Sequence, residues 1–175
     1  MRPEKMLTPT PIEKSFIPSE NRLRFRDALG RFATGITVVT ADSARGPLGM
    51  TVNSFASVSL DPPLILWSPA KSSHRFQVFE SAEYFAVHVL SVDQEDICHS
   101  FSRSGHAFET LNWGRSEHGV PLIEGCLSRF ECRTKAVHDG GDHVIVVGEV
   151  IRVAVAEGEP LLVWRGNYGG FEREE

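Results

Sequence analysis

The chain has 175 residues and carries 18 Lys and Arg against 23 Asp and Glu, a net charge of −5, which fits one acidic domain. Hydrophobic residues make up 41% of the sequence and charged residues 23%, which excludes a disordered or collagen-like chain. No apolar run approaches the ~18 residues of a membrane span, so no membrane is expected as a partner. The three cysteines, Cys98, Cys126 and Cys132, form neither a metal pattern nor a disulfide framework, which favours a reducing, cytoplasmic setting.

Residues 1–20 hold four of the ten prolines and no glycine, which predicts an extended N-terminal arm ahead of a domain over residues 21–175. Such an arm is either a frayed terminus or a segment that lies over a neighbouring subunit or the mouth of a site. Residues 1–31 carry seven Lys and Arg against four Asp and Glu, a net +3, which leaves 11 against 19, or −8, for the rest. Because the body is acidic and shows no basic stripe, we do not expect nucleic acid as a partner.

The first predicted elements are a helix and a strand. Asn21 is placed to cap a helix whose apolar residues follow at helical spacing and which ends near Thr34-Gly35. Residues 36–41 are rich in β-branched side chains, which indicates a strand.

Residues 50–60 alternate between the two faces of a second predicted strand. The alternation breaks at Ser54 and Phe55, where we expect a bulge or bend of the kind that re-aims side chains beside a site. The apolar face of this strand comprises Met50, Val52, Ala56, Val58 and Leu60.

Further strands follow after residue 60. Residues 128–136 alternate, with Arg129 and Glu131 among the outward side chains, and Asp139-Gly140-Gly141 turns the chain into a β-branched partner at 144–155. The absence of a βαβ rhythm and of a GxGxxG or Walker motif predicts a mainly β fold, an antiparallel barrel with a few short peripheral helices. The other strands are predicted over residues 64–67, 84–90 and 161–164.

Two short helices are predicted between these strands. Ser72 or Ser73 is placed to cap the first and Asp93 the second. Residues 102–119 are predicted to form a surface loop, and residues 121–125 a turn.

The polar face of the 50–60 strand is the first candidate site. Thr51, Asn53 and Ser57 place hydroxyl and amide groups in a row. Short side chains of this kind can match the alternating carbonyl and N–H groups at the edge of a planar heteroaromatic ring such as a flavin. The alternative is that these residues simply face water.

A second candidate lies in the segment 69–73, at a strand-to-helix junction. Lys71, Ser72 and Ser73 bring an ammonium and two hydroxyls to the N–H groups of a helix start, a combination that suits a phosphate. The alternative is an ordinary helix cap beside an exposed lysine.

The third candidate is Gly141-Asp142-His143, which leads from a turn into a strand. An imidazole at a strand start can donate a hydrogen bond or a proton near neutral pH. The alternative, which the pattern of a lone histidine favours, is a surface or structural role. The remaining histidines lack ligand spacing such as HExxH, so we expect no metal site.

Five sequence motifs occur along the chain in an order that is typical of one family. They are FRDALGRFATGITVVT at 25–40, GMTVNSFASVSLDPPL at 49–64, FAVHVL at 85–90 with Gln94, GDH at 141–143 running into GEV at 148–150, and PLL at 160–162 ending at Gly166 and Tyr168. In this order they resemble the flavin reductase-like family over about residues 22–171.

The resemblance implies an FMN-binding split β-barrel, usually a homodimer, that uses NADH or NADPH to reduce FMN or FAD. Members of the family commonly serve as the reductase component of two-component flavin-dependent monooxygenases, to which the reduced flavin diffuses. Whether this chain prefers FMN or FAD, and NADH or NADPH, stays open. By position, the resemblance assigns Thr51, Asn53 and Ser54 to the flavin-contacting strand, Ala56 and Ser57 to the isoalloxazine, Lys71, Ser72 and Ser73 to the phosphate, Asp142 and His143 to the nicotinamide and catalysis, and Tyr168 to the C-terminal edge of the site.

Hydride transfer to flavin N5 needs two rings held about 3 to 3.5 Å apart, so most of the protein's task is positioning. We expect His143 to orient the nicotinamide or to donate a hydrogen bond near the reacting edge. Two other functions fit the same fold: a protein that retains its flavin and passes electrons to another acceptor, and a flavin- or heme-binding module without turnover.

Overall fold

The computed structural model describes residues 15–171 of the chain, so residues 1–14 of the expected N-terminal arm lie outside the described part. A 3-10 turn, η1, covers Pro18–Glu20, and helix α1 covers Arg22–Leu29. Asn21 caps α1 as predicted, its Oδ1 accepting from the Arg24 N–H at 3.0 Å. The helix ends earlier than predicted, with Gly30 as its C-cap, and Thr34–Gly35 form a short strand, β1, paired with a strand near the C-terminus.

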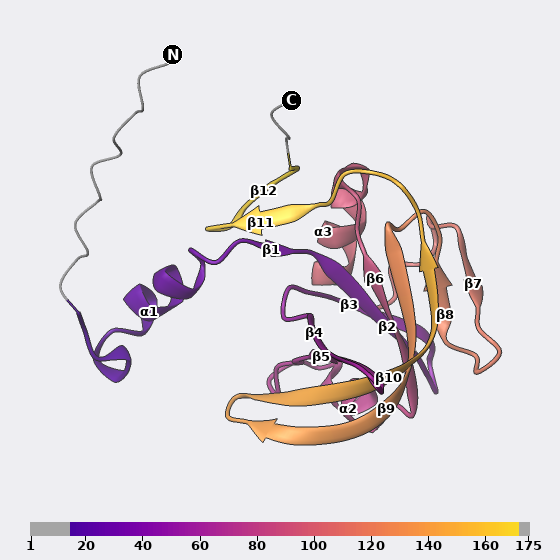
Figure 1. The fold of residues 1–175 in the computed structure, drawn as a ribbon, viewed down its shortest axis with the longest axis horizontal. Helices are drawn as coiled ribbons and strands as arrows, with labels where there is room; N and C mark the ends of the chain where they lie inside the picture. The colour runs from indigo at the N-terminus through magenta and orange to yellow at the C-terminus, as the bar shows by residue number, and fades with distance from the viewer. Residues whose placement is uncertain (1–14, 172–175) are drawn as a thin grey trace, which may run out of the picture.

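Seven antiparallel strands form the main sheet, in the order β3-β2-β6-β9-β10-β5-β4 (Figure 1). The two edge strands, β3 (Gly46–Val52) and β4 (Ala56–Leu60), follow one another in the chain and are joined only by residues 53–55. Three residues span at most ~10 Å, so the sheet must curl until its two edges meet at this corner. The result is a barrel left open along the seam between β3 and β4. The remaining strands of this sheet are β2 (Thr37–Ser43), β5 (Pro63–Trp67), β6 (Tyr84–Val89), β9 (Ser128–Gly140) and β10 (His143–Val155).

The single strand predicted over residues 50–60 is therefore two strands on opposite edges of the sheet. The predicted irregularity at Ser54 and Phe55 is where the chain leaves one edge for the other. The expected apolar face is correspondingly wrong for β4, because Val58 and Leu60 are 48% and 96% exposed. No strand of the described part of the chain pairs with the outer edge of β4.

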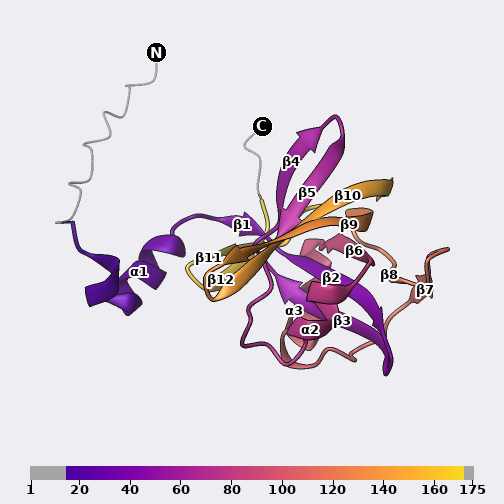
Figure 2. The same ribbon diagram turned by 90° about the horizontal axis from the view of Figure 1, so that it is seen from below.

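Two small sheets and three short elements surround the barrel (Figure 2). Residues predicted as a turn form strand β8, and the C-terminal hairpin has a second strand, β12, that was not predicted. The added strands are β7 (Trp113–Arg115), β8 (Pro121–Ile123), β11 (Leu162–Trp164) and β12 (Asn167–Gly169), and the helices are α2 (Phe76–Ser81), η2 (Val92–Gln94) and α3 (Glu95–Arg103).

Both predicted helix caps are wrong by a few residues. Arg75, not Ser72 or Ser73, precedes α2, while the Ser73 hydroxyl accepts from the Arg75 N–H at 3.2 Å. Ser91, not Asp93, starts the second helical segment through a capping box with Gln94. Ser91 has the capping chemistry that Asp93 was expected to supply, whereas the Arg75 side chain makes no capping hydrogen bond at the start of α2.

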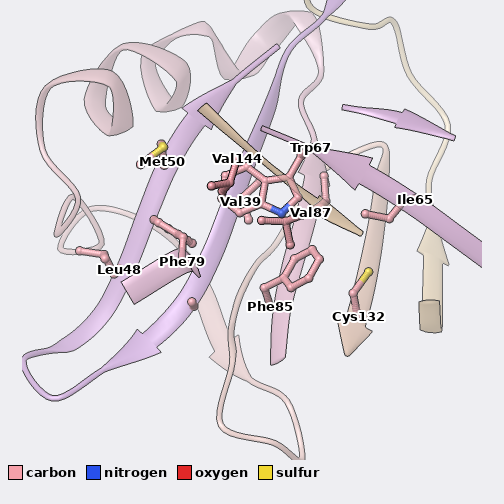
Figure 3. Packing of buried hydrophobic residues seen from close by; sticks show 12 residues of the cluster. Val39, Leu48, Met50, Ile65, Trp67, Phe79, Phe85, Val87, Cys132 and Val144 are labelled. Carbon is pink, nitrogen blue, oxygen red and sulfur yellow. The ribbon is translucent and has the colours of Figure 1, made fainter. Parts of the chain in front are cut away.

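The barrel interior is filled by a cluster that includes Trp67, Phe79, Phe85 and Val39 (Figure 3). Strand β2 is buried on both faces, since Val39 packs in this cluster and Val38 packs in a second one beneath α3. This explains the nearly continuous apolar run predicted as a strand. One outward assignment is wrong, because Glu131 is buried beside Arg129, at 3.5 Å. The mainly β, antiparallel split-barrel fold with short peripheral helices is confirmed.

Candidate functional site

The two motifs expected to bind phosphate and nicotinamide lie against each other. The Lys71 N–H donates to the Asp142 carbonyl at 2.9 Å, and the Val144 N–H donates to the Pro69 carbonyl at 3.2 Å. These contacts arise because β5 and β10 are neighbours in the sheet, so the segment after β5 meets the turn before β10. Gly141 adopts φ +80° in that turn, a left-handed conformation that favours glycine.

Lys71 is held by the same turn through its side chain. Its Nζ donates to the Asp139 carboxylate and to the Gly141 carbonyl, the latter at 2.7 Å. This contact holds the pKa of Asp139 below its ordinary value. The sequence pattern marked Asp139 only as a turn residue, and its role beside Lys71 depends on a strand pairing that the pattern does not reveal.

Asp142 and His143 form a hydrogen-bonded pair, with Nδ1 of His143 at 2.7 Å from the Asp142 carboxylate. The bond to His143 lowers the pKa of the Asp142 carboxyl. A carboxylate only accepts, so the proton of this bond sits on Nδ1 and the chemistry of Nε2 depends on the ionisation of the ring. The His143 side chain is 44% exposed, which leaves the imidazole accessible to a ligand.

The seam between β3 and β4 carries the predicted ring-binding residues. Asn53, Ala56 and Ser57 are exposed there. Ser54 instead fastens the seam, because its Oγ accepts from the Ser68 N–H at 2.9 Å. The seam is thereby joined to the start of the segment that contains Lys71. The Thr51 hydroxyl points toward α3 and donates to the Cys98 carbonyl at 2.7 Å.

Tyr168 reaches the same region from the C-terminal hairpin. Its ring lies nearly perpendicular to that of His99 on α3, with centroids 5.1 Å apart. Partial desolvation and the hydrogen bond with Cys98 raise the pKa of the Tyr168 hydroxyl, although the residue is 38% exposed. Tyr168 and Thr51 therefore meet at α3, and the described contacts connect Tyr168 to that helix rather than to the Asp142–His143 turn. His99 is a site-facing candidate that the sequence did not single out.

The donor set suits a phosphate-bearing planar ring. An ammonium and serine hydroxyls lie at one end of the seam, and an exposed amide and hydroxyl lie along it. Within residues 15–171, no three His, Cys, Asp or Glu side chains cluster in a way that could hold a metal ion. A separate hollow of about 410 Å³ between α3 and residues 123–125 contains none of the predicted site residues. In the same described range, no helix is long and apolar enough to span a membrane.

Comparison with known proteins supports the same assignment. The family model described as "Flavin reductase like domain" matches residues 29–172. The chain is 57% identical to the FMN reductase (NADH) SmoA of Agrobacterium fabrum, over 94% of this chain and 95% of that protein. It is 43% identical to HsaB of Mycobacterium tuberculosis, the reductase subunit of a flavin-dependent monooxygenase, over 86% and 83% of the two chains.

A solved structure of the NADH:FAD oxidoreductase SgcE6 of Streptomyces globisporus, in complex with NAD and FAD fragments, superimposes with a TM-score of 0.84 at 37% identity. The match covers 91% of this chain and 98% of that one. These likenesses confirm the oxidoreductase class and support a reductase rather than a flavin-retaining protein or a binding module. The chain belongs to the flavin reductase-like family.

Proposed function

We propose that this protein uses NADH to reduce FMN and releases the reduced flavin to a separate monooxygenase component. The observation that carries the proposal is the junction of the Lys71 segment with the Asp142–His143 turn, beside an exposed polar seam. One compact site can therefore receive a flavin phosphate and a nicotinamide together. Relatives named as an NADH-dependent FMN reductase and as monooxygenase reductase subunits agree with this chemistry.

In the proposed complex, the serine hydroxyls and the ammonium of Lys71, Ser72 and Ser73 bind the phosphate. The ring edge lies along the seam against Thr51, Asn53, Ser54, Ala56 and Ser57, and Tyr168 bounds the site at α3. When bound, the flavin supplies an N5 that accepts a hydride from the nicotinamide C4. The protein's share is to hold both rings in near-attack geometry.

His143 orients the nicotinamide in this proposal, and Asp142 orients His143. The 2.7 Å bond fixes the orientation of the ring and keeps a proton on Nδ1, which leaves Nε2 for the incoming ligand. A relative named as an NADH-dependent FMN reductase is 57% identical to this chain over 94% of its length, which favours NADH as the donor. We therefore propose NADH over NADPH.

We also propose that the protein is a homodimer. No side chain of the described helix α1 is buried. Leu23 on the helix and Phe32 just after it are largely exposed. An isolated helix of this length is marginal in water, so α1 requires a covering surface. A second copy fits on charge, since the N-terminal residues 1–31 carry a net +3 and the remaining body −8. Three buried free thiols agree with a reducing, cytoplasmic setting.

The decisive experiment measures aerobic NADH consumption by flavin-free protein, with excess FMN or FAD and with NADPH as the alternative donor. Saturable turnover that depends on free flavin supports the reductase and identifies its preferred flavin. Absence of turnover with every combination contradicts the proposed function. Light scattering during size-exclusion chromatography tests the dimer, which a monomeric mass would exclude.

The phosphate assignment has its own test. The double variant Lys71→Ala with Ser72→Ala should weaken FMN binding about tenfold while riboflavin binding changes little, because only FMN has the phosphate that these groups contact. Fluorescence titration of both flavins measures the difference. An equal loss for riboflavin would place the phosphate elsewhere.

A further inference from the structure

Arg75 follows the phosphate-binding segment and turns its side chain away from it, into the fold. Its Nη1 donates to the Gly49 carbonyl at 3.0 Å and to the Phe101 carbonyl at 2.6 Å. Its Nη2 donates to the Ser102 carbonyl at 3.2 Å. One guanidinium thus joins the start of α2 to strand β3 and to the last turn of α3.

The surroundings suit a partly buried cation without a carboxylate partner. Partial burial lowers the pKa of Arg75, yet a guanidinium stays protonated in proteins. Within residues 15–171, its side-chain bonds go to backbone carbonyls. Two of these belong to the C-terminal turn of α3, where the helix dipole favours a positive charge.

Close packing around Arg75 depends on two glycines. A Cβ added at Gly49 would lie 2.5 Å from the Phe101 ring, and one at Gly105 would lie 2.9 Å from Cδ of Arg75. The Gly49 N–H also donates to the Gly105 carbonyl at 2.8 Å. Small residues therefore let β3, the end of α3 and Arg75 approach to hydrogen-bonding distance.

Hydrogen bonds hold the segment that carries Lys71, Ser72 and Ser73 at both of its ends, and Arg75 makes those at one end. The first fastening is the Ser68–Ser54 hydrogen bond at the seam. The second is Arg75, whose carbonyl acceptor at Gly49 lies on β3 just before Thr51. Segment 68–75 is thus held at one end to Ser54, in the linker between β3 and β4, and at the other end to β3, which carries Thr51.

We infer that Arg75 is a positioning residue that sets the distance between the phosphate-binding segment and the edge of the seam formed by β3. It thereby sets the preference for a phosphorylated flavin over riboflavin. This inference rests on the proposed function. Arginine suits the role because its planar fork supplies several donors at once, whereas lysine offers a compact point charge and methionine offers only packing.

The test compares Arg75→Met and Arg75→Lys with Arg103→Met, in which an exposed arginine at the end of the same helix α3 is replaced. Fluorescence titration gives Kd for FMN and for riboflavin, and steady-state kinetics give KM for NADH. Arg75→Met should raise Kd for FMN about tenfold and Kd for riboflavin less than about threefold, because the phosphate contacts alone lose their register. KM for NADH should stay within about twofold, and Arg103→Met should match the wild type.

Arg75→Lys should fall between the wild type and Arg75→Met, and millimolar methylguanidinium should recover part of the FMN affinity of Arg75→Met. Equal losses for FMN and riboflavin would overturn the inference, since they indicate a general loosening of the fold. If Arg75→Met shows no cooperative thermal transition, the FMN-to-riboflavin ratio of Arg75→Lys decides in the same way. Wild-type protein that reduces flavin but binds riboflavin as tightly as FMN overturns the inference and leaves the reductase intact. Wild-type protein that neither binds nor reduces flavin refutes the proposed function itself.

Discussion

Two histidines of the barrel, His88 on β6 and His143 at the start of β10, have opposite surroundings. His88 is 0% exposed, and both ring nitrogens are engaged, Nδ1 with the Val38 carbonyl and Nε2 with the Ile123 N–H, each at 3.0 Å. His143 is partly exposed and bonded to the Asp142 carboxylate through Nδ1. One ring is enclosed between strands, and the other stands at an open turn.

This difference separates a structural role from a chemical one. At His88, an N–H donor and a carbonyl acceptor on opposite sides fix a neutral tautomer, and burial lowers the pKa to about 4. The ring therefore joins β2, β6 and β8 and stays uncharged near neutral pH. At His143, an anionic partner and access to solvent leave the ring able to meet a ligand.

Removal of His88 should have the largest effect. His88→Ala deletes two buried hydrogen bonds and leaves a cavity at the junction of β6 and β8, so the free energy of unfolding should fall by about 3 kcal/mol. Urea denaturation measures it. His143→Ala is the matched control and should change stability by less than about 0.5 kcal/mol. Equal destabilisation by the two substitutions would contradict the contrast.

Acidification should lower the stability of the folded protein through the buried ring of His88. The folded-state pKa of about 4 lies below the ordinary value of 6.5, so the unfolded chain binds a proton that the folded protein excludes between these values. The contribution of His88 to the free energy of unfolding is therefore fully present above pH 6.5. It is lost as the pH drops toward 4, by about 3 kcal/mol in total.

The control for this pH dependence is His88→Gln, which keeps a neutral donor and acceptor at the same position. Exposed carboxyls with lowered pKa, such as Asp27 and Asp139, also lose stabilising interactions as the pH falls. This loss is the same in the wild type and in His88→Gln. Denaturation midpoints from pH 7 to pH 4 should therefore decline more steeply in the wild type than in His88→Gln. Parallel curves would show that His88 does not resist protonation.

His143→Ala should impair catalysis instead. We expect kcat/KM for NADH to fall about tenfold while Kd for FMN changes less than about twofold, because the lost hydrogen bond acts on the nicotinamide. Steady-state kinetics and flavin titration give the two quantities. Equal losses in both would remove His143 from the nicotinamide side.

Much of the fold could be predicted from local pattern. The β-branched runs at 36–41 and 144–155, the turn at Gly141 and the Asn21 cap all depend on neighbours in sequence, and the structure confirms them. What the pattern missed depends on pairing between distant segments. Alternation over residues 50–60 cannot show that the chain changes from one sheet edge to the other, since the apolar and polar residues keep the same alternating order in the sequence on both sides of the change.

The candidate site divides in the same way. Residue chemistry and motif order identified Lys71, Asp142 and His143, and the contact between their segments follows only from the pairing of β5 with β10. Asp139 and Arg75 escaped notice because their partners lie far away in sequence, and a carboxylate in a turn or an arginine at a helix start has no distinctive local pattern.

The smallest predicted effect concerns Asp142 itself. Its pKa is lowered chiefly by the hydrogen bond to His143, so His143→Ala should raise that pKa toward the ordinary value of 3.8. Carboxyl ¹³C chemical shifts followed through a pH titration measure it. Asp139 is an internal control, because its pKa is lowered by Lys71 and should not move. An Asp142 titration unchanged by the substitution would mean that this carboxylate does not orient His143 in solution, and the exposed histidine would then lack the fixed geometry that distinguishes it from any other surface imidazole.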